Sequence, residues 1–258
     1  MGRESTIENG GPVLSAYVSA PEGVPSPNAL VLCHGFPSRQ RPGAPSRSYH
    51  QLADRITEQL GWAVLAVSLR GCGESQGNFS LGGWVDDVNR AVSHLRGEVG
   101  ADEVWVAGST TGGSLAILAA ADNPDISGVA AIAARADFDD WDREPDQLLN
   151  HARTVAVIKD ADFPSDVEAW RSELSRNRPI DRVAEMADRP LLILHGSADL
   201  QVPPSDARRL ADAHGSAELR IIAGGDHRLR HDPRAVALLL GWLGRREEET
   251  DETAPSCL

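Results

Sequence analysis

Short apolar runs recur along the chain and alternate with segments that have the period of amphipathic helices. Most of the runs are continuous, which is typical of parallel strands buried on both faces of a sheet. The predicted strands are Leu14–Val18, Ala29–Cys33, Ala63–Leu69, Val104–Ala107, Val129–Ala133, Leu191–Leu194 and Leu219–Ile222. The predicted helices are Tyr49–Leu60, Gly83–Leu95, Gly112–Ala121, Pro204–Ala213 and Pro233–Arg246. This order predicts an α/β fold, a doubly wound and mostly parallel sheet with helices on both sides, and its first strand can pair as an antiparallel edge strand.

The alternation stops in one long stretch, residues 135–190, which is too long for an ordinary loop. We interpret it as a small helical cap inserted into the fold. Its short helices are expected around Asp146–Val157, Pro164–Ser175 and Ile180–Ala187. A cap over the carboxyl ends of the strands would roof a pocket, and Trp141, Phe163 and Trp170 are candidates for substrate binding there. The alternative is that these aromatic side chains only hold the cap to the body.

Composition limits the class of protein and its partners. The 258 residues are 41% apolar, which fits one soluble domain over residues 1–258, and no apolar run reaches the roughly 20 residues that span a bilayer. A net charge of -13 argues against nucleic acid or an anionic membrane as a partner, so a small-molecule substrate is expected. Three cysteines without paired spacing favour a reducing, cytoplasmic setting. The acidic residues 247–258 are predicted to form a disordered tail, and the sequence leaves the oligomeric state open.

Candidate chemistry begins with the stretch Val104–Gly113, which combines a strand, a glycine-rich turn and a helix. In a Gly-x-nucleophile-x-Gly elbow, small residues let strand and helix approach closely while the nucleophile sits exposed in a strained conformation. Here Gly108 and Gly112 bracket Thr110, so a threonine stands where a serine nucleophile is expected.

Two residues further along the chain complete a candidate triad with Thr110. Asp199 lies in a loop that follows a predicted strand, and His227 lies between the last predicted strand and the last predicted helix. Parallel strands bring such positions to one crevice, and the order nucleophile, acid, histidine is that of a known catalytic triad. His227 and His231 are four residues apart but no third ligand accompanies them, so no metal site is predicted. The glycine-rich turn lacks the lysine of a phosphate loop and the spacing of a dinucleotide site, so no cofactor is expected.

These features, with two more motifs, resemble the α/β-hydrolase superfamily in its bacterial esterase and serine-peptidase-like branch, over about residues 29–243. The added motifs are Leu32-Cys-His-Gly-Phe-Pro and the turn Leu69-Arg-Gly-Cys-Gly-Glu-Ser-Gln-Gly. The resemblance implies an α/β-hydrolase fold and an oxyanion hole formed by the backbone N–H groups of Phe36 and Thr111. The second motif is expected to be mainly structural, because its glycines permit a tight turn.

The threonine leaves several hypotheses open. A β-branched residue at positive φ costs roughly 1 to 3 kcal/mol, and its methyl group crowds the site. One hypothesis is a carboxylesterase-like hydrolase of small esters or thioesters, in which Thr110 attacks and His227, oriented by Asp199, moves the proton. Another is a non-hydrolytic enzyme of the proton-transfer, lyase or cyclisation type with a retired nucleophile. A third is a catalytically silent binding protein.

Ser109 is an alternative nucleophile in a shifted frame. That frame is poorer, because Ala107 and the bulkier Thr111 would then occupy the small-residue positions. In the preferred frame the side chain of Ser109 is expected to point away from the crevice.

Overall fold

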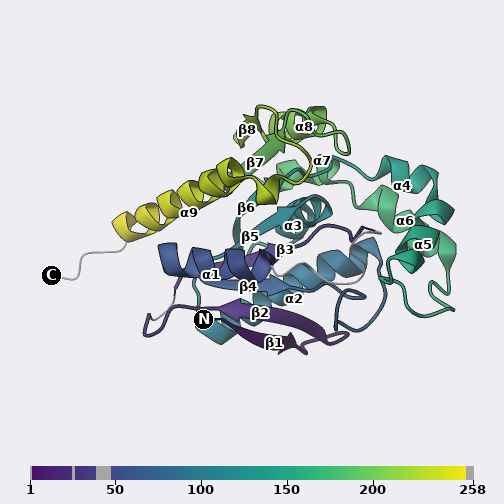
Figure 1. Cartoon of the computed structure of the whole chain (residues 1–258), viewed down its shortest axis with the longest axis horizontal. Helices are drawn as coiled ribbons and strands as arrows, with labels where there is room; N and C mark the ends of the chain where they lie inside the picture. The colour runs from purple at the N-terminus through teal and green to yellow at the C-terminus, as the bar shows by residue number, and fades with distance from the viewer. Residues whose placement is uncertain (1, 25–26, 39–47, 254–258) are drawn as a thin grey trace.

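The computed structural model describes residues 2–24, 27–38 and 48–253, with the backbone alone described for 247–253. In this part of the chain, eight strands form one sheet in the order β1-β2-β4-β3-β5-β6-β7-β8 (Figure 1). The strands are β1 (Arg3–Ile7), β2 (Leu14–Ser19), β3 (Ala29–Cys33), β4 (Ala63–Val67), β5 (Val104–Ser109), β6 (Ile126–Ile132), β7 (Leu191–Gly196) and β8 (Glu218–Ile222). β1 and β2 are antiparallel to their neighbours and all other pairs are parallel, which confirms the predicted fold class.

The helices of the body also lie where the sequence predicts them. They are α1 (Ser48–Leu60), α2 (Leu81–Val99), α3 (Thr111–Asp122), α8 (Pro204–His214) and α9 (Pro233–Thr253). The helix α9 continues into the segment 247–258 for which a disordered tail is predicted, since the run Arg-Arg-Glu-Glu-Glu that begins at Arg245 consists of good helix formers. Residues 254–258 lie outside the described residues.

One strand was missed, and it changes the edge of the sheet. β2 is antiparallel to β4 as expected, but β1 pairs with its outer side and takes the edge position. The sequence of β1, Arg-Glu-Ser-Thr-Ile, is mostly polar because only Ile7 is buried and the rest of the strand is largely exposed. A polar edge strand of this kind gives little hydrophobic pattern to recognise.

Alternate residues of the central strands face two separate apolar clusters, one on each side of the sheet. Val31 of β3 belongs to the cluster covered by α2, α3 and α8, whereas Leu30 and Leu32 belong to the cluster covered by α1 and α9. Burial on both faces explains why the strands appear as continuous apolar runs. None of the helices in the described ranges has the length and apolar character needed to cross a membrane.

The segment interpreted as a cap contains a series of short helices. They are α4 (Asp139–Arg143), α5 (Pro145–Thr154), α6 (Val167–Arg176), α7 (Pro179–Arg182) and the 3-10 helix η1 (Val183–Met186). Figure 1 shows α4, α5 and α6 grouped at one side of the molecule. Helix α6 packs against both α4 and α2, so the cap is attached to the body through the helix that also covers the sheet.

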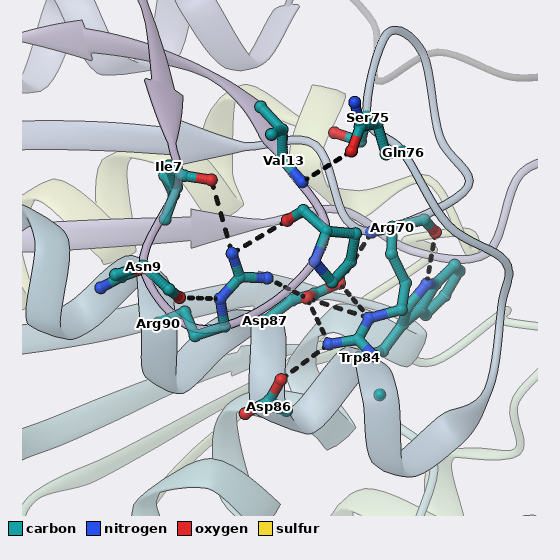
Figure 2. A network of polar contacts seen from close by, with 12 residues as sticks. Ile7, Asn9, Val13, Arg70, Ser75, Gln76, Trp84, Asp86, Asp87 and Arg90 are labelled. Atoms are coloured by element: carbon teal, nitrogen blue, oxygen red, sulfur yellow. Dashed lines mark hydrogen bonds and ion pairs between the residues drawn. The ribbon is translucent and has the colours of Figure 1, made fainter.

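A buried carboxylate ties three segments of the body together (Figure 2). Asp87 of α2 accepts hydrogen bonds from the backbone N–H of Arg70 at 2.7 Å and from its guanidinium at 2.7 to 3.0 Å. Arg90 approaches the same carboxylate at 3.3 Å and donates to the carbonyls of Asn9 and Pro12 at 2.6 and 2.9 Å. Asp87 therefore holds the glycine-rich turn after β4 to α2, and it pairs with Arg90, which holds the β1–β2 turn to the same helix.

We expect Asp87→Ala to lower the free energy of unfolding by about 3 to 5 kcal/mol, because Arg90 would stay buried and lose its carboxylate partner, and Arg70 would be left with the exposed Asp86. Asp86→Ala is the matched control, since Asp86 pairs with Arg70 through a side chain that is 55% exposed and should contribute at most about 1 kcal/mol. Urea unfolding of both variants measures the difference. Equal losses of unfolding free energy in the two variants would show that the buried position of Asp87 adds nothing to stability.

Candidate active site

The turn between β5 and α3 has the geometry of a strained elbow. Thr110 stands between the two elements with φ 56° and ψ -122°, and its N–H donates to the carbonyl of Ile132 at 2.8 Å. A Cβ atom on Gly108 would lie 2.1 Å from the carbonyl oxygen of Gly112, and one on Gly112 would lie 2.5 Å from the carbonyl oxygen of Cys33. Only glycine fits at either position, so β5, α3 and the loop after β3 meet at backbone distance.

The hydroxyl of Thr110 lies against this same loop. A Cβ atom on Gly35 would fall 1.8 Å from Thr110 Oγ1, which shows how closely the oxygen packs on the backbone. Phe36 follows in the loop, and Thr111 opens α3, where the first N–H groups have no acceptor within the helix and carry its partial positive charge. The two backbone groups predicted to form an oxyanion hole thus belong to segments on either side of Thr110.

Asp199 and His227 are brought together as predicted. His227 Nδ1 lies 2.9 Å from Asp199 Oδ2, and the side chain of Asp199 is completely buried. The other carboxylate oxygen accepts backbone N–H groups from Gln201 and Val202, both at 2.9 Å. These bonds fix the carboxylate, which in turn holds the proton on Nδ1 and leaves Nε2 of His227 as the basic nitrogen. Among the described atoms, no hydrogen bond joins Nε2 to Thr110 Oγ1.

A second histidine supports the carboxylate from behind. His195, at the end of β7, is fully buried, and its Nε2 lies 3.0 Å from the carbonyl of Val202 and 3.4 Å from Asp199 Oδ2. Because Nε2 faces two oxygens, it carries the proton and donates. His195 therefore supports the loop that carries Asp199.

A third histidine orders the loop before Phe36. His34 is buried at the end of β3, where its Nε2 accepts the N–H of Leu69 at 3.1 Å and its Nδ1 donates to the carbonyl of Gly35 at 2.8 Å. Burial lowers the pKa of His34 to about 4, so the ring is neutral at physiological pH. The neutral ring can make both bonds, and it links the β3 loop to the end of β4.

Thr110 and His227 line one pocket of about 1280 Å³. Phe36 and Tyr49 contribute to its wall, and Ser109 does too, which differs from the expectation that Ser109 faces away. Ser109 points to the side of the sheet that α1 covers. Tyr49, at the start of α1, lines the pocket on the same side. The segment from Gly224 to Arg234 forms another part of the wall. Sequence patterns gave no signal for Tyr49 or for this wall, because neither belongs to a recognisable motif.

The cap residues proposed for substrate binding lie elsewhere. Trp141 packs its ring 5.3 Å from the ring of Phe36, and Trp170 is buried and donates its indole N–H to the carbonyl of Phe79 at 3.1 Å. Phe163 is half-buried against the same apolar cluster. None of the three is among the described residues that line the pocket, so their contacts fit the alternative interpretation, attachment of the cap to the body. Through Trp141 the cap also packs against the loop that carries Phe36.

Metal ligands are not clustered in the described ranges, where no group of three or more His, Cys, Asp or Glu side chains is placed to hold an ion.

Comparison with known proteins identifies the family of the chain. A family model described as the alpha/beta hydrolase family matches residues 30–238. The chain belongs to this family. It is 35% identical to a soluble epoxide hydrolase of Corynebacterium sp. (strain C12) over 113 residues, which are 43% of this chain and 34% of that protein. The match thus spans about a third of the length of that curated relative.

Solved alpha/beta structures resemble the whole chain. Est1E from Butyrivibrio proteoclasticus is 18% identical with a TM-score of 0.70, over 97% of this chain and 99% of that chain. The thioesterase domain from the curacin biosynthetic pathway is 15% identical with a TM-score of 0.64, over 94% and 99%. At such low identities these likenesses show a shared fold.

We expect the stability of this alpha/beta hydrolase to depend on pH through His34. In the unfolded chain the imidazole takes up a proton near pH 6.5, whereas the folded protein keeps it neutral down to about pH 4. Falling pH in this window therefore favours unfolding, by about 3 kcal/mol at its lower end. Between pH 7 and pH 4, the free energy of unfolding measured in urea should fall less for His34→Gln than for the native protein. Parallel pH profiles for the two proteins would contradict the assignment.

We also expect Gly35→Ala to lower the free energy of unfolding by about 1 to 3 kcal/mol, because the new methyl group meets Thr110 Oγ1 and a backbone carbonyl. Gly97→Ala is the control, since a Cβ there has open space within α2 and should stabilise the helix by about 0.5 to 1 kcal/mol. Thermal unfolding measures both. A Gly35→Ala variant as stable as the native protein would contradict the close packing of Gly35 against Thr110.

Proposed function

We propose that the protein hydrolyses small carboxylic esters or thioesters, with Thr110 as nucleophile, His227 as general base and Asp199 as its orienting carboxylate. The observation that carries the proposal is that a hydroxyl at a positive-φ elbow shares a pocket with a histidine bonded to a buried aspartate. A buried aspartate of this kind keeps the histidine in the tautomer that accepts a proton.

The proposed reaction has two halves. His227 Nε2 takes the hydroxyl proton while Thr110 Oγ1 attacks the carbonyl carbon, and the backbone N–H groups of Phe36 and Thr111 stabilise the oxyanion. The protonated His227 gives its proton to the leaving alcohol or thiol as that bond breaks. His227 then takes a proton from water as the water attacks the acyl-threonine, and it returns the proton to Thr110 Oγ1 as the ester bond breaks and the acid leaves.

Several features favour a hydrolase with a small-molecule substrate over other enzyme classes. The fold neighbours include an esterase and a thioesterase domain, and the curated relative is an epoxide hydrolase. Cys33 and Cys72 are buried free cysteines, which fits the proposal of a reducing, cytoplasmic setting. The intact pairing of His227 with Asp199 weighs against a catalytically silent binding protein.

A second candidate function is proton transfer without covalent attack. It is favoured by the position of Thr110 Oγ1, which packs on Gly35 and has no hydrogen bond to His227 in the described structure. In that case His227 takes a proton from water or directly from the substrate, and Thr110 only contacts the ligand. Direct proton abstraction would allow a lyase or cyclisation reaction in place of hydrolysis.

Kinetics on short-chain 4-nitrophenyl esters test the proposal. We expect slow hydrolysis by the native protein and a loss of about 10³-fold or more in His227→Ala and Thr110→Ala, because each variant removes a group that acts in the transition state. Thr110→Ser should retain or raise activity, since it keeps the hydroxyl and removes the crowding methyl. A fluorophosphonate probe should label the native protein and Thr110→Ser but not Thr110→Ala.

Two outcomes would redirect the assignment. Full activity in Thr110→Ala with loss in His227→Ala would exclude covalent attack and favour the water route. Loss of activity and labelling in Ser109→Ala, with both retained in Thr110→Ala, would move the nucleophile to Ser109. Circular dichroism of each variant confirms that it is folded.

A further inference from the structure

The pocket wall that follows His227 is rich in arginine, although the chain as a whole carries a net charge of -13. Arg228, Arg230 and Arg234 all line the pocket, together with Asp226 and Asp232. The two carboxylates are engaged by neighbours on the same wall. Asp232 binds the guanidinium of Arg234 at 2.6 Å, and Asp226 approaches that of Arg228 at 3.5 Å. The acidic side chains of this wall therefore pair locally with Arg234 and Arg228.

Arg230 is the arginine that the fold holds in one place beside the site. It lies in the 3-10 helix η2 (Leu229–His231), where Leu229 is fully buried and anchors a turn that begins two residues after His227. Its guanidinium stacks 4.7 Å from the centre of the Tyr49 ring and donates a hydrogen bond to Ser48 Oγ. A guanidinium has five N–H donors in a planar fork, so it can bind a serine and a ligand carboxylate together.

Two further observations place this charge close to the reacting groups. Tyr49, on which Arg230 stacks, lines the same pocket as Thr110 and His227. Burial is the main cause that lowers the pKa of His34, and the hydrogen bond to Gly35 opposes it. The positive charge of Arg230 adds to the lowering. Arg230 thus lies on Tyr49 in the pocket wall, and its charge also acts on His34, which orders the loop leading to Phe36.

We infer that the substrate carries a carboxylate, and that Arg230 binds it as the specificity-determining residue of the pocket. This inference rests on the proposed ester hydrolysis for its reaction but not for its binding step. A carboxylate suits the site because a guanidinium fork binds it through two parallel N–H···O bonds, which fix orientation as well as charge. The aromatic face of Tyr49 keeps the fork oriented before the ligand arrives, so less side-chain entropy is lost on binding.

Kinetics on a matched pair of esters test Arg230. The anionic substrate is mono-4-nitrophenyl glutarate and the neutral one is 4-nitrophenyl pentanoate. We expect the native protein to prefer the glutarate ester, and Arg230→Gln to lower the ratio of kcat/KM for the two esters by about 10- to 100-fold, mainly through KM. Arg230→Lys keeps the charge without the fork and should give an intermediate ratio. An unchanged ratio in Arg230→Gln would overturn the inference.

A control variant and a binding measurement separate this inference from the proposed function. Arg220→Gln removes the same charge from an exposed position on β8 and should leave the ratio as it is, whereas an equal fall would mean that only net charge matters. If neither ester is hydrolysed, calorimetry with glutarate still decides. Binding to the native protein that is lost in Arg230→Gln supports the carboxylate site alone, and absence of binding to the native protein overturns it.

Discussion

The close approach of three backbone segments around Thr110 is the constraint on which the site depends. β5, the start of α3 and the loop after β3 meet where Gly108, Gly112 and Gly35 leave no room for a Cβ atom. This contact sets the positive φ of Thr110 and places its hydroxyl on the loop that carries Phe36. It also brings the N-terminus of α3 under the same point, so the partial positive charge of the helix faces the pocket.

The rest of the body holds these segments at the required distance. His34 ties the β3 loop to Leu69 at the end of β4, and the adjacent Arg70 is bound by the buried carboxylate of Asp87. On the outer side, Phe36 packs against aromatic rings of the body and against Trp141 of the cap. The loop is therefore fixed by polar contacts from the sheet and by apolar contacts from the cap, and loosening either would move the predicted oxyanion groups.

The parts of the fold that follow from the sequence are those that burial dictates. Continuous apolar strands and amphipathic helices predicted the parallel sheet, and the glycines of the elbow predicted the turn at Thr110. The edge strand β1 escaped notice because an exposed strand carries no apolar pattern. The pairing of Asp199 with His227 was predictable because carboxyl ends of parallel strands converge. The particular partners of Trp141 and Trp170, and the position of the arginine segment beside Tyr49, were not predictable, because they depend on contacts between segments far apart in the chain.

The threonine itself becomes more informative once its surroundings are known. A glycine at this position would adopt φ 56° without strain, whereas a β-branched residue there costs roughly 1 to 3 kcal/mol and must be held by its neighbours. The packing described above supplies that hold, so the elbow tolerates a hydroxyl-bearing side chain at a conformational cost. A purely structural turn gains nothing from such a side chain, since the strand-to-helix contact is made by the glycines. We therefore propose that the part of the cost not met by packing is offset by what the hydroxyl does in the pocket, in attack or in ligand contact.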